Sequence, residues 1–353
     1  MNYSKNDFLQ ELAYNSLFNN EEQILEHKID DYVLLDDNAV CDNQLQEIMT
    51  GLNDYNRVEK NTYFKVHKGY PSPRSLYPIR LFVTTRTGSF ITKNEQTKKF
   101  ELYENAAREA DEGDILLEYG KIYPKYYKSI KKSLLLLEAG HLIFNINHVA
   151  TTCGDHYTVL EKEGYLLLKK ANIPHQDYQH AKLEGFYHLS SIRNSGPYLH
   201  PITAFNLIPL LDDSSDFQRL YNQLNRLFVH PLKENAIQLI RLHNDGNGMF
   251  NIPESQTKVD YKKLNSIYPY INFKGVSGMY VFTIDNLVFN EEGKVTPYIL
   301  AIGFLAQFYC MMYASEENYC RPVKSFSVGT FENLLGINGS QKTIMYSVII
   351  GAK

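Results

Sequence analysis

The residues with the clearest capacity for chemistry lie in a proline-fixed turn at positions 71–75. The turn reads Pro-Ser-Pro-Arg-Ser and runs directly into the apolar, β-branched segment 79–86. Proline presets the backbone φ, and a fixed turn can hold amides, hydroxyls and a guanidinium towards a polar or anionic ligand. Core packing does not call for such a composition. We therefore expect a polar ligand here, with these candidate contacts: Pro71, Ser72, Arg74 and Ser75.

A second candidate site is the segment Ser-Ile-Arg-Asn-Ser, which contains Arg193 and Ser195. A guanidinium fork beside a hydroxyl is suited to binding a phosphate group. The alternative is a turn at the start of a helix, with Arg193 on the surface. His148, Cys153 and His156 also lie close together in the sequence, but their spacing matches no standard metal site, so we expect no metal there.

The elements that must position these residues follow from the apolar pattern. Two segments are apolar on nearly every face, 133–152 and 297–315, which predicts two buried helices. Alternating or β-branched segments predict strands at 79–86, 164–170, 278–289 and 343–353. Helical spacing is found within residues 1–60, at 201–213 and at 216–229.

The order of these elements occurs twice, with a period of about 160 residues. In the two apolar helices, residues 136–145 align with 299–308, which matches Gly140 to Gly303. The turn-and-strand segments 69–83 and 273–287 align as well, with Ser72 or Ser75 near Ser277. We expect an α+β fold of two packed halves. Its expected parts are an N-terminal helical segment at 1–60, a first half at 61–180 and a second half at 181–353.

Length and composition exclude several classes of protein. The chain has 353 residues, of which 44% are hydrophobic and 22% charged, which is typical of a soluble globular protein. A net charge of −4 gives no general attraction to nucleic acid or anionic lipid. The N-terminus lacks a secretory pattern and no apolar run reaches about 18 residues, so we expect a cytoplasmic protein without a membrane span. None of the four cysteines has the spacing of a zinc or redox motif.

Several segments together resemble the SagB-type dehydrogenases, a branch of the FMN-dependent nitroreductase superfamily. PSPRSLYPIRLFV (71–83) resembles that branch's PSAGALYPLELYV segment, and LLEAGHLIFNINHVATTCG (136–154) resembles its LLEAGHLAQNLYLAATALG helix. The segment at 191–211 resembles the RRSxRxF…PI…LxxLL opening of nitroreductases, and the C-terminal segment at 321–351 resembles their PIGGF…LLGL…YVVALG ending. The resemblance covers most of residues 60–353.

Nitroreductases are dimers with FMN in the subunit interface, so the resemblance implies an intramolecular pseudo-dimer with a nitroreductase-like fold and FMN between its halves. In the family, one subunit supplies an RxSxR segment and the other supplies the PS turn. In this chain the former survives as Arg193 and Ser195, and the latter as Pro71 and Ser72. The reciprocal RxSxR is absent from residues 20–40, so we expect one flavin site. The resemblance extends cofactor roles to Asn145, Lys324 and Lys353.

Lys125 and Tyr126 match a Lys-Tyr pair that precedes LEAGH in azoline dehydrogenases, about one residue out of register. The resemblance implies that this pair is the acid/base that removes a carbon-bound proton while hydride passes to the flavin. Positions 121, 125, 128, 131 and 132 are all lysine, however, so a solvated basic face is the alternative interpretation.

The function implied by the resemblance is FMN-dependent oxidation of azoline rings to thiazoles or oxazoles in a ribosomal peptide. It implies a peptide substrate and a cyclodehydratase or other biosynthetic partner, and it leaves a homo-oligomer open. One alternative is an FMN-dependent reductase or oxidase of another peptide or small molecule. Another is a flavin-free scaffold, favoured by three departures from the family pattern: Arg74 for Gly, Phe144 for Gln and Pro197 for Arg.

Overall fold

The structure is a computed structural model. It describes residues 22–23, 33–35, 48–49, 51–58, 66–94, 97–104, 109–119, 123–124, 127, 130–152, 155–162, 164–171, 185–195, 207–211, 214–269, 271–290 and 295–352. Within 1–60, the described residues include the short strands β1 (Glu22–Gln23), β2 (Val33–Leu35) and β3 (Arg57–Val58). The remaining helical pattern expected there lies outside the described residues, apart from helical residues at 48–49 and 51–53.

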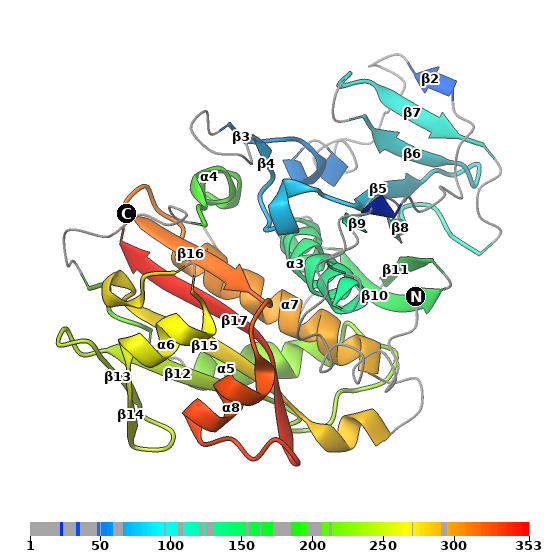
Figure 1. The fold of residues 1–353 in the computed structure, drawn as a ribbon. Helices are drawn as coiled ribbons and strands as arrows, with labels where there is room; N and C mark the ends of the chain where they lie inside the picture. The colour runs from blue at the N-terminus through cyan, green and yellow to red at the C-terminus, as the bar shows by residue number, and fades with distance from the viewer. Residues whose placement is uncertain are drawn as a thin grey trace.

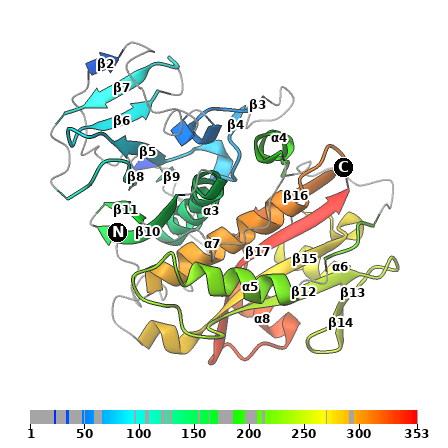
Figure 2. The ribbon, with the colours of Figure 1, turned by 180° about the vertical axis from the view of Figure 1, so that it is seen from behind.

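Two antiparallel sheets lie on either side of a pair of central helices (Figures 1 and 2). The helices are α3 (Lys131–Thr152) and α7 (Val295–Met312). The first sheet has the order β10 (His156–Lys162), β11 (Tyr165–Ala171), β8 (Ile115–Tyr119), β5 (Ile79–Thr84), β6 (Phe90–Lys93), β7 (Phe100–Tyr103) and β2. The second has the order β14 (Thr257–Asp260), β13 (Met249–Ile252), β12 (Ile237–Asn244), β15 (Gly278–Asp285), β17 (Lys342–Ala352) and β16 (Asn318–Val323).

Smaller elements complete the described fold. Two two-stranded ribbons pair β1 with β9 (Tyr123–Pro124) and β3 with β4 (Val66–His67). The other helices are η1 (Pro73–Ser75), α4 (Phe186–Ile192), α5 (Ser214–Leu224), α6 (Tyr261–Ile267), η4 (Phe273–Gly275), η5 (Asn286–Asn290) and α8 (Val328–Leu335).

Strand alternation explains how the sheets form the core. In β15, Tyr280, Phe282 and Ile284 belong to the core that contains α3 and α7, while Met279 and Val281 pack in a second cluster with residues of α6 and α8. Because successive side chains of a strand point to opposite faces, a strand covered on both faces is apolar throughout. The nearly continuous apolar run at 278–284 follows from this arrangement.

The strand order shows that the two halves repeat one another. Each half contains four strands, then a long helix, then two more strands. In the first half these are β5, β6, β7, β8, α3, β10 and β11; in the second they are β12, β13, β14, β15, α7, β16 and β17. The hydrogen-bonded order in the sheets agrees for these six strands of each half, and the first sheet has β2 as an additional edge strand. This order corrects the sequence alignment of the turns: segment 69–83 leads into β5 and therefore corresponds to the segment before β12, not to 273–287. The alignment of the two apolar helices agrees with the structure, because α3 and α7 occupy the same place in this order.

The matched glycines of the two helices lie at the helix crossing. A Cβ on Gly140 would lie 2.2 Å from the carbonyl oxygen of Leu300, and a Cβ on Gly303 would lie 2.2 Å from that of Leu137. Leu137 and Leu300 are themselves matched in the alignment of the helices. Each contact therefore has its reciprocal, as at an interface between two copies related by a two-fold axis. The contact allows the backbones of α3 and α7 to approach more closely than any side chain permits.

Replacing Gly140 by alanine is expected to destabilise the protein by about 1–3 kcal/mol, because the added methyl group meets backbone that cannot move independently. Gly329→Ala in α8 is the control, since a Cβ there meets nothing within 4 Å and alanine favours helix. Urea unfolding of the two variants measures the difference. Equal stability of both variants would show that the helix crossing tolerates a side chain.

A buried polar cluster lies beside this crossing. His141 Nδ1 is 2.9 Å from Gln307 Oε1, and His141 Nε2 is 3.2 Å from the Tyr346 hydroxyl. Gln307 Nε2 donates to Asn145 Oδ1 and to the carbonyl oxygen of Gly69, both at 2.9 Å. Burial lowers the pKa of His141 to about 3, so the imidazole is neutral at neutral pH. The cluster joins α3, α7, β17 and the segment before β5.

Stability is expected to fall on acidification because of His141. Its pKa is about 3 in the folded state and about 6.5 when unfolded, so the unfolded state binds more protons between these values. Lowering the pH from 7 to 5 is expected to remove about 2 kcal/mol. His141→Gln, which cannot titrate, is less stable at pH 7 but has a smaller loss. Urea titrations at both pH values test this, and identical losses in the two proteins would contradict it.

The structure differs from the predicted elements in places with a physical cause. The two apolar helices and the four predicted strands are present. The expected helix at 201–213 is not helical at its described residues, 207–211, where Pro209 removes an amide donor. There the amide of Ile208 donates to Ser277 Oγ and that of Leu211 to the Tyr313 hydroxyl. Helix α7 is long and apolar enough to cross a membrane by length and composition alone, but 89% of that stretch is buried in the fold.

Candidate functional site

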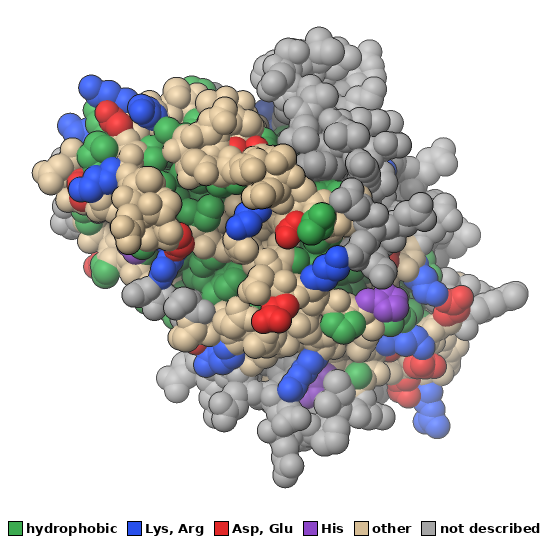
Figure 3. Space-filling model, turned by 90° about the horizontal axis from the view of Figure 1, so that it is seen from below, with side chains coloured by type: hydrophobic (Ala, Val, Ile, Leu, Met, Phe, Trp, Pro, Cys, Tyr) green, Lys and Arg blue, Asp and Glu red, His purple; other side chains and the backbone are tan. Residues whose placement is uncertain are grey.

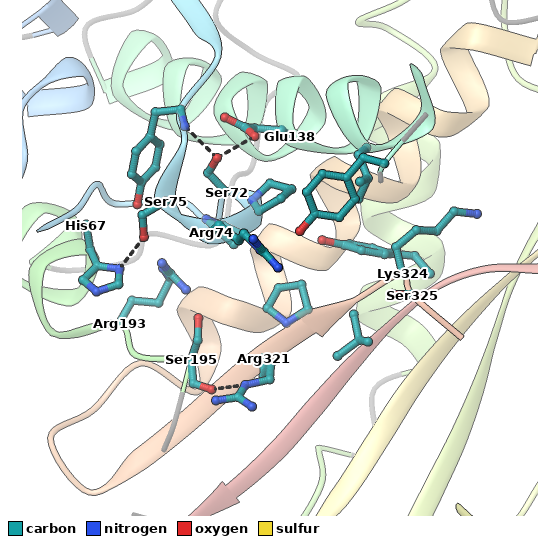
Figure 4. A pocket seen from close by; sticks show the side chains of 18 of the residues that line it. His67, Ser72, Arg74, Ser75, Glu138, Arg193, Ser195, Arg321, Lys324 and Ser325 are labelled. Carbon is teal, nitrogen blue, oxygen red and sulfur yellow. Dashed lines mark hydrogen bonds between the residues drawn. The ribbon is translucent and has the colours of Figure 1, made fainter. Parts of the chain in front are cut away.

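A cavity of about 290 Å³ lies between the two halves (Figure 4). The first half contributes the 71–75 turn, His67 of β4 and one face of α3, and Arg57 of β3 comes from the preceding N-terminal segment. The second half contributes Arg193–Ser195, residues 321–325 at the end of β16, and Tyr346 of β17. This volume is near the lower end of the roughly 300–1,000 Å³ of small-molecule sites.

The turn is anchored through Ser72. Its hydroxyl donates to Glu138 Oε2 of α3 at 2.8 Å and accepts from the amide of Tyr77 at 2.9 Å (Figure 4). The Tyr77 hydroxyl in turn accepts from the amide of Lys68 at 2.8 Å, and burial raises the pKa of Tyr77 to about 12. The hydroxyl hydrogen of Ser72 is thus used within the protein, and the serine holds the turn in place.

The backbone of this turn is held in a left-handed conformation. Arg74 and Ser75 have φ of 53° and Tyr77 has φ of 46°, values that non-glycine residues seldom adopt. The amides of Ser75 and Leu76 donate to the carbonyl oxygens of Ser72 and Pro73 at 3.1 and 3.2 Å. The sequence suggested that amides of the turn would bind a ligand, but these amides close the turn. The group that the turn directs to the cavity is the guanidinium of Arg74 (Figure 4).

Arg193, on the opposite wall, is a buried cation. Only 2% of it is exposed, and its Nε and Nη1 have no hydrogen-bond partner among the described residues. The following segment is clamped to β16, because Asn194 O accepts from the amide of Cys320 at 2.8 Å and Ser195 O accepts from Arg321 Nε at 2.6 Å. Burying a guanidinium with two of its nitrogens unpartnered is costly, so this geometry fits an anion in the cavity.

The charge of the described cavity lining agrees with an anionic ligand. The cationic residues of this lining outnumber the acidic ones by five to one: Arg57, Arg74, Arg193, Arg321 and Lys324 against Glu138. Apolar side chains also line the cavity, among them Ile130, Leu134, Val323 and Tyr346. A ligand with an anionic group and a flat or apolar body fits this combination.

The structure places most of the predicted ligand residues around this one cavity. The lining contains Pro71, Ser72, Arg74, Ser75, Arg193, Ser195 and Lys324. Asn145 lies outside the lining, in the buried polar cluster, where its Nδ2 donates to the carbonyl oxygen of Gly69 at 3.4 Å. Lys125, Tyr126, Pro197 and Lys353 lie outside the described residues. Their roles, and the ligand roles of the others, stay predictions.

Sequence reasoning missed further residues of the lining. Glu138 lies inside the LEAGH motif, so the motif could have indicated it. Arg321 lies three residues before Lys324, and its proximity to that predicted ligand was a usable signal. Arg57, His67 and Tyr346 come from a short ribbon and a central strand whose convergence on the turn depends on the folded chain.

The corresponding place on the other side of the two helices is closed. By strand order, β10 corresponds to β16, and the segment before β12 corresponds to the 71–75 turn. There the amide of Val159 in β10 donates to the carbonyl oxygen of Leu227 at 2.6 Å, and Val159 pairs with Phe228 in a parallel bridge. Among the described residues, backbone contact between β10 and residues 227–228 therefore occupies the place that corresponds to the cavity between β16 and the 71–75 turn.

The comparisons with known proteins bear on the fold. No family model and no curated protein matches the chain. A solved protein from Anabaena variabilis, assigned as a nitroreductase, is similar at 14% identity over 99% of this chain and 97% of that chain, with a TM-score of 0.64. A Ralstonia eutropha protein with the same assignment (16% identity, 51% of this chain and 87% of that chain) has a TM-score of 0.32. An FMN- and NADPH-dependent nitroreductase from a Sphingopyxis strain (14% identity, 46% and 86%) has a TM-score of 0.27.

The first of these likenesses spans the whole chain and shows its fold. The protein has a nitroreductase-like α+β fold, with the two repeated halves described above joined in one chain. This confirms the fold class predicted from the sequence.

Arg193→Leu is expected to leave the ligand-free protein at least as stable as the wild type, because it removes a buried charge whose Nε and Nη1 have no hydrogen-bond partner among the described residues. Arg321→Leu is the matched control and should lose about 1–3 kcal/mol, because it breaks the hydrogen bond to Ser195 O. Urea unfolding of ligand-free protein compares the two. A large loss for Arg193→Leu would mean that the guanidinium supports the fold rather than a ligand.

Proposed function

We propose that the protein is an FMN-dependent oxidoreductase with its flavin in the cavity between the halves. The observation that carries this proposal is the buried guanidinium of Arg193, directed into a cation-rich cavity of a nitroreductase-like fold. A degenerate, flavin-free scaffold gives no reason to keep such a charge buried, since leucine or methionine would fill the position at no electrostatic cost. The scaffold is therefore the weaker alternative.

Arg193 and Lys324 are the residues that would hold the phosphate, because both are buried cations of the second half, 2% and 8% exposed. Ile130, Leu134 and Tyr346 offer apolar surface to the ring. When bound, the flavin supplies reversible uptake of a hydride. Ser72 and Glu138 support the site indirectly, by fixing the turn that closes the cavity.

The proposed reaction is the oxidation of azoline rings to azoles in a ribosomal peptide. The resemblance of the 71–83 and 136–154 segments to the SagB-type dehydrogenases supports it. In this proposal Lys125 and Tyr126 hold and move the proton that leaves the ring carbon. A peptide substrate, a cyclodehydratase partner and a cytoplasmic location belong to the same proposal. Reduction or oxidation of another substrate is the alternative within flavin chemistry.

The purified protein is expected to carry one FMN per chain. The reason is that Ser72 and Arg193 line the same cavity, while backbone closes the corresponding place at Val159 and Leu227. Flavin extraction and quantitation, with absorbance at about 450 nm, provide the measurement. Arg193→Leu should lose the flavin and remain folded. Two flavins per chain, FAD in place of FMN, or full occupancy in Arg193→Leu would each count against this site.

Lys125→Ala and Tyr126→Phe are expected to retain FMN but to lose most azole formation. A positioned acid/base typically contributes about 10²–10⁴-fold in rate, so the loss should be large. The assay follows a mass loss of about 2 Da per oxidised ring on an azoline-containing peptide, since oxidation of each ring removes two hydrogens.

Lys128→Ala is the control for this pair, because a lysine of a solvated basic face should affect neither flavin content nor turnover. Near-normal turnover of both Lys125→Ala and Tyr126→Phe would rule out the assignment of the pair. Loss of turnover in Lys128→Ala alone would move the base to that position.

A further inference from the structure

Tyr346 belongs both to the cavity lining and to the buried polar cluster beside the helix crossing. It lines the cavity from β17, and its hydroxyl oxygen lies 3.2 Å from His141 Nε2. Burial raises the pKa of Tyr346 well above its usual value, so the phenol is neutral. The charges of Glu138 and Arg193 also act on that pKa, in opposite directions. The hydroxyl is therefore within electrostatic range of both walls of the cavity.

The hydrogen bonds of the cluster have one consistent direction. Gln307 Nε2 lies 2.9 Å from the carbonyl oxygen of Gly69, which can only accept, so the amide oxygen of Gln307 faces His141 Nδ1. That oxygen can only accept as well, so Nδ1 carries a hydrogen. Because burial lowers the pKa of His141 to about 3, the imidazole is neutral and its Nε2 carries none. Tyr346 therefore donates its hydroxyl hydrogen to His141 Nε2.

With its hydrogen bound to His141, the Tyr346 hydroxyl can act towards a ligand only as a hydrogen-bond acceptor. Beyond His141 the chain of hydrogen bonds continues through Gln307 to Asn145, and both are amides that do not titrate. His141 itself resists protonation. The cluster therefore does not carry a proton away from the cavity. It fixes the direction of one hydrogen bond at the cavity wall.

The cavity lining is rich in hydrogen-bond donors. Five of its described residues are arginine or lysine, whose charged groups donate hydrogen bonds and cannot accept them, whatever else they contact. This gathering of cations is local, since on the face in Figure 3 cationic and acidic side chains are interspersed. Glu138 can accept, but its Oε2 already accepts from Ser72. A buried donor of a ligand therefore needs an acceptor such as Tyr346.

The flavin of the proposed function brings such a donor. Its oxidised ring system has a single N–H, in the imide group, and this N–H can only donate. The ribityl hydroxyls both donate and accept, so the donors of the lining can satisfy them. The imide N–H is thus the group of the ligand that requires the Tyr346 oxygen.

We infer that the Tyr346 hydroxyl accepts a hydrogen bond from the imide N–H of the flavin ring, and that His141 and Gln307 are positioning residues that hold it as an acceptor. The inference rests on the proposed function and adds how the site recognises the ring. This recognition is separate from the phosphate, which Arg193 and Lys324 would bind. A flavin that lacks the N–H should therefore bind less tightly even though its phosphate is unchanged.

The first test determines the tautomer of His141 in the ligand-free protein by nitrogen NMR. Protonated and unprotonated nitrogens of a neutral imidazole have well separated chemical shifts, and His141→Gln identifies the signals of this residue by their absence. A hydrogen on Nδ1 and none on Nε2 is the expected result. The opposite tautomer would make Tyr346 accept from His141, would leave its hydrogen for the ligand, and would overturn the inference.

The second test compares FMN with FMN methylated at the imide nitrogen, by fluorescence titration of the flavin-free protein. The wild type is expected to bind the methylated flavin about 3- to 10-fold more weakly than FMN. Tyr346→Phe should bind FMN about 3- to 10-fold more weakly than the wild type and should lose most of the preference. Tyr268→Phe is the matched control and should keep both. It removes a hydroxyl that lies 2.9 Å from Ser347 Oγ, on the other face of β17.

The outcomes separate this inference from the proposed function. A wild type that binds no FMN overturns the proposed function, and the recognition of the ring falls with it. Tight binding of FMN without a preference over the methylated flavin overturns the inference alone. The same conclusion follows if Tyr346→Phe keeps the full preference of the wild type, or if Tyr268→Phe loses as much of it as Tyr346→Phe does.

Discussion

The close approach of α3 and α7 is the constraint on which the rest of the structure depends. With glycine at 140 and 303, the two backbones touch, and the sheets on either side are set at a fixed separation. That separation brings the turn at 71–75 opposite Arg193 and the end of β16. A side chain at either glycine would push the helices apart and change the width of the cavity. The crossing is therefore a structural requirement of the site, although neither glycine lines it.

The two sides of this crossing are chemically different. On one side His141 and Gln307 form a buried polar pair; on the other, Phe144 packs edge-on against Phe304 with the ring centroids 5.0 Å apart. In the alignment of the helices, His141 corresponds to Phe304 and Phe144 to Gln307, so each half keeps one polar and one aromatic member. The cavity is similarly one-sided, because Val159 and Leu227 close the corresponding place. A chain with two joined halves can specialise them in this way, whereas identical subunits cannot.

The sequence was most informative where burial dictates composition. The two central helices are apolar all round because both are covered, and their glycines could be matched without a structure. The counterpart of segment 69–83 was placed wrongly, because its sequence resembles 273–287, which lies three strands further along the chain than the segment before β12. The grouping of Ser72 with Arg193 followed from a family resemblance. The commitment of the Ser72 hydroxyl to Glu138, and the convergence of Arg57 on the cavity, depend on contacts between distant segments that no local pattern encodes.

Joining the two halves in one chain also changes how the cavity depends on dilution. When such a site forms between separate subunits, it disappears as the dimer dissociates, so its occupancy varies with protein concentration. Here the two walls are held at an effective concentration of about millimolar or above, whatever the amount of protein present. A cell that makes only a few copies of this protein would therefore still contain fully assembled sites. Synthesis of one chain gives one complete cavity, without an encounter between partners.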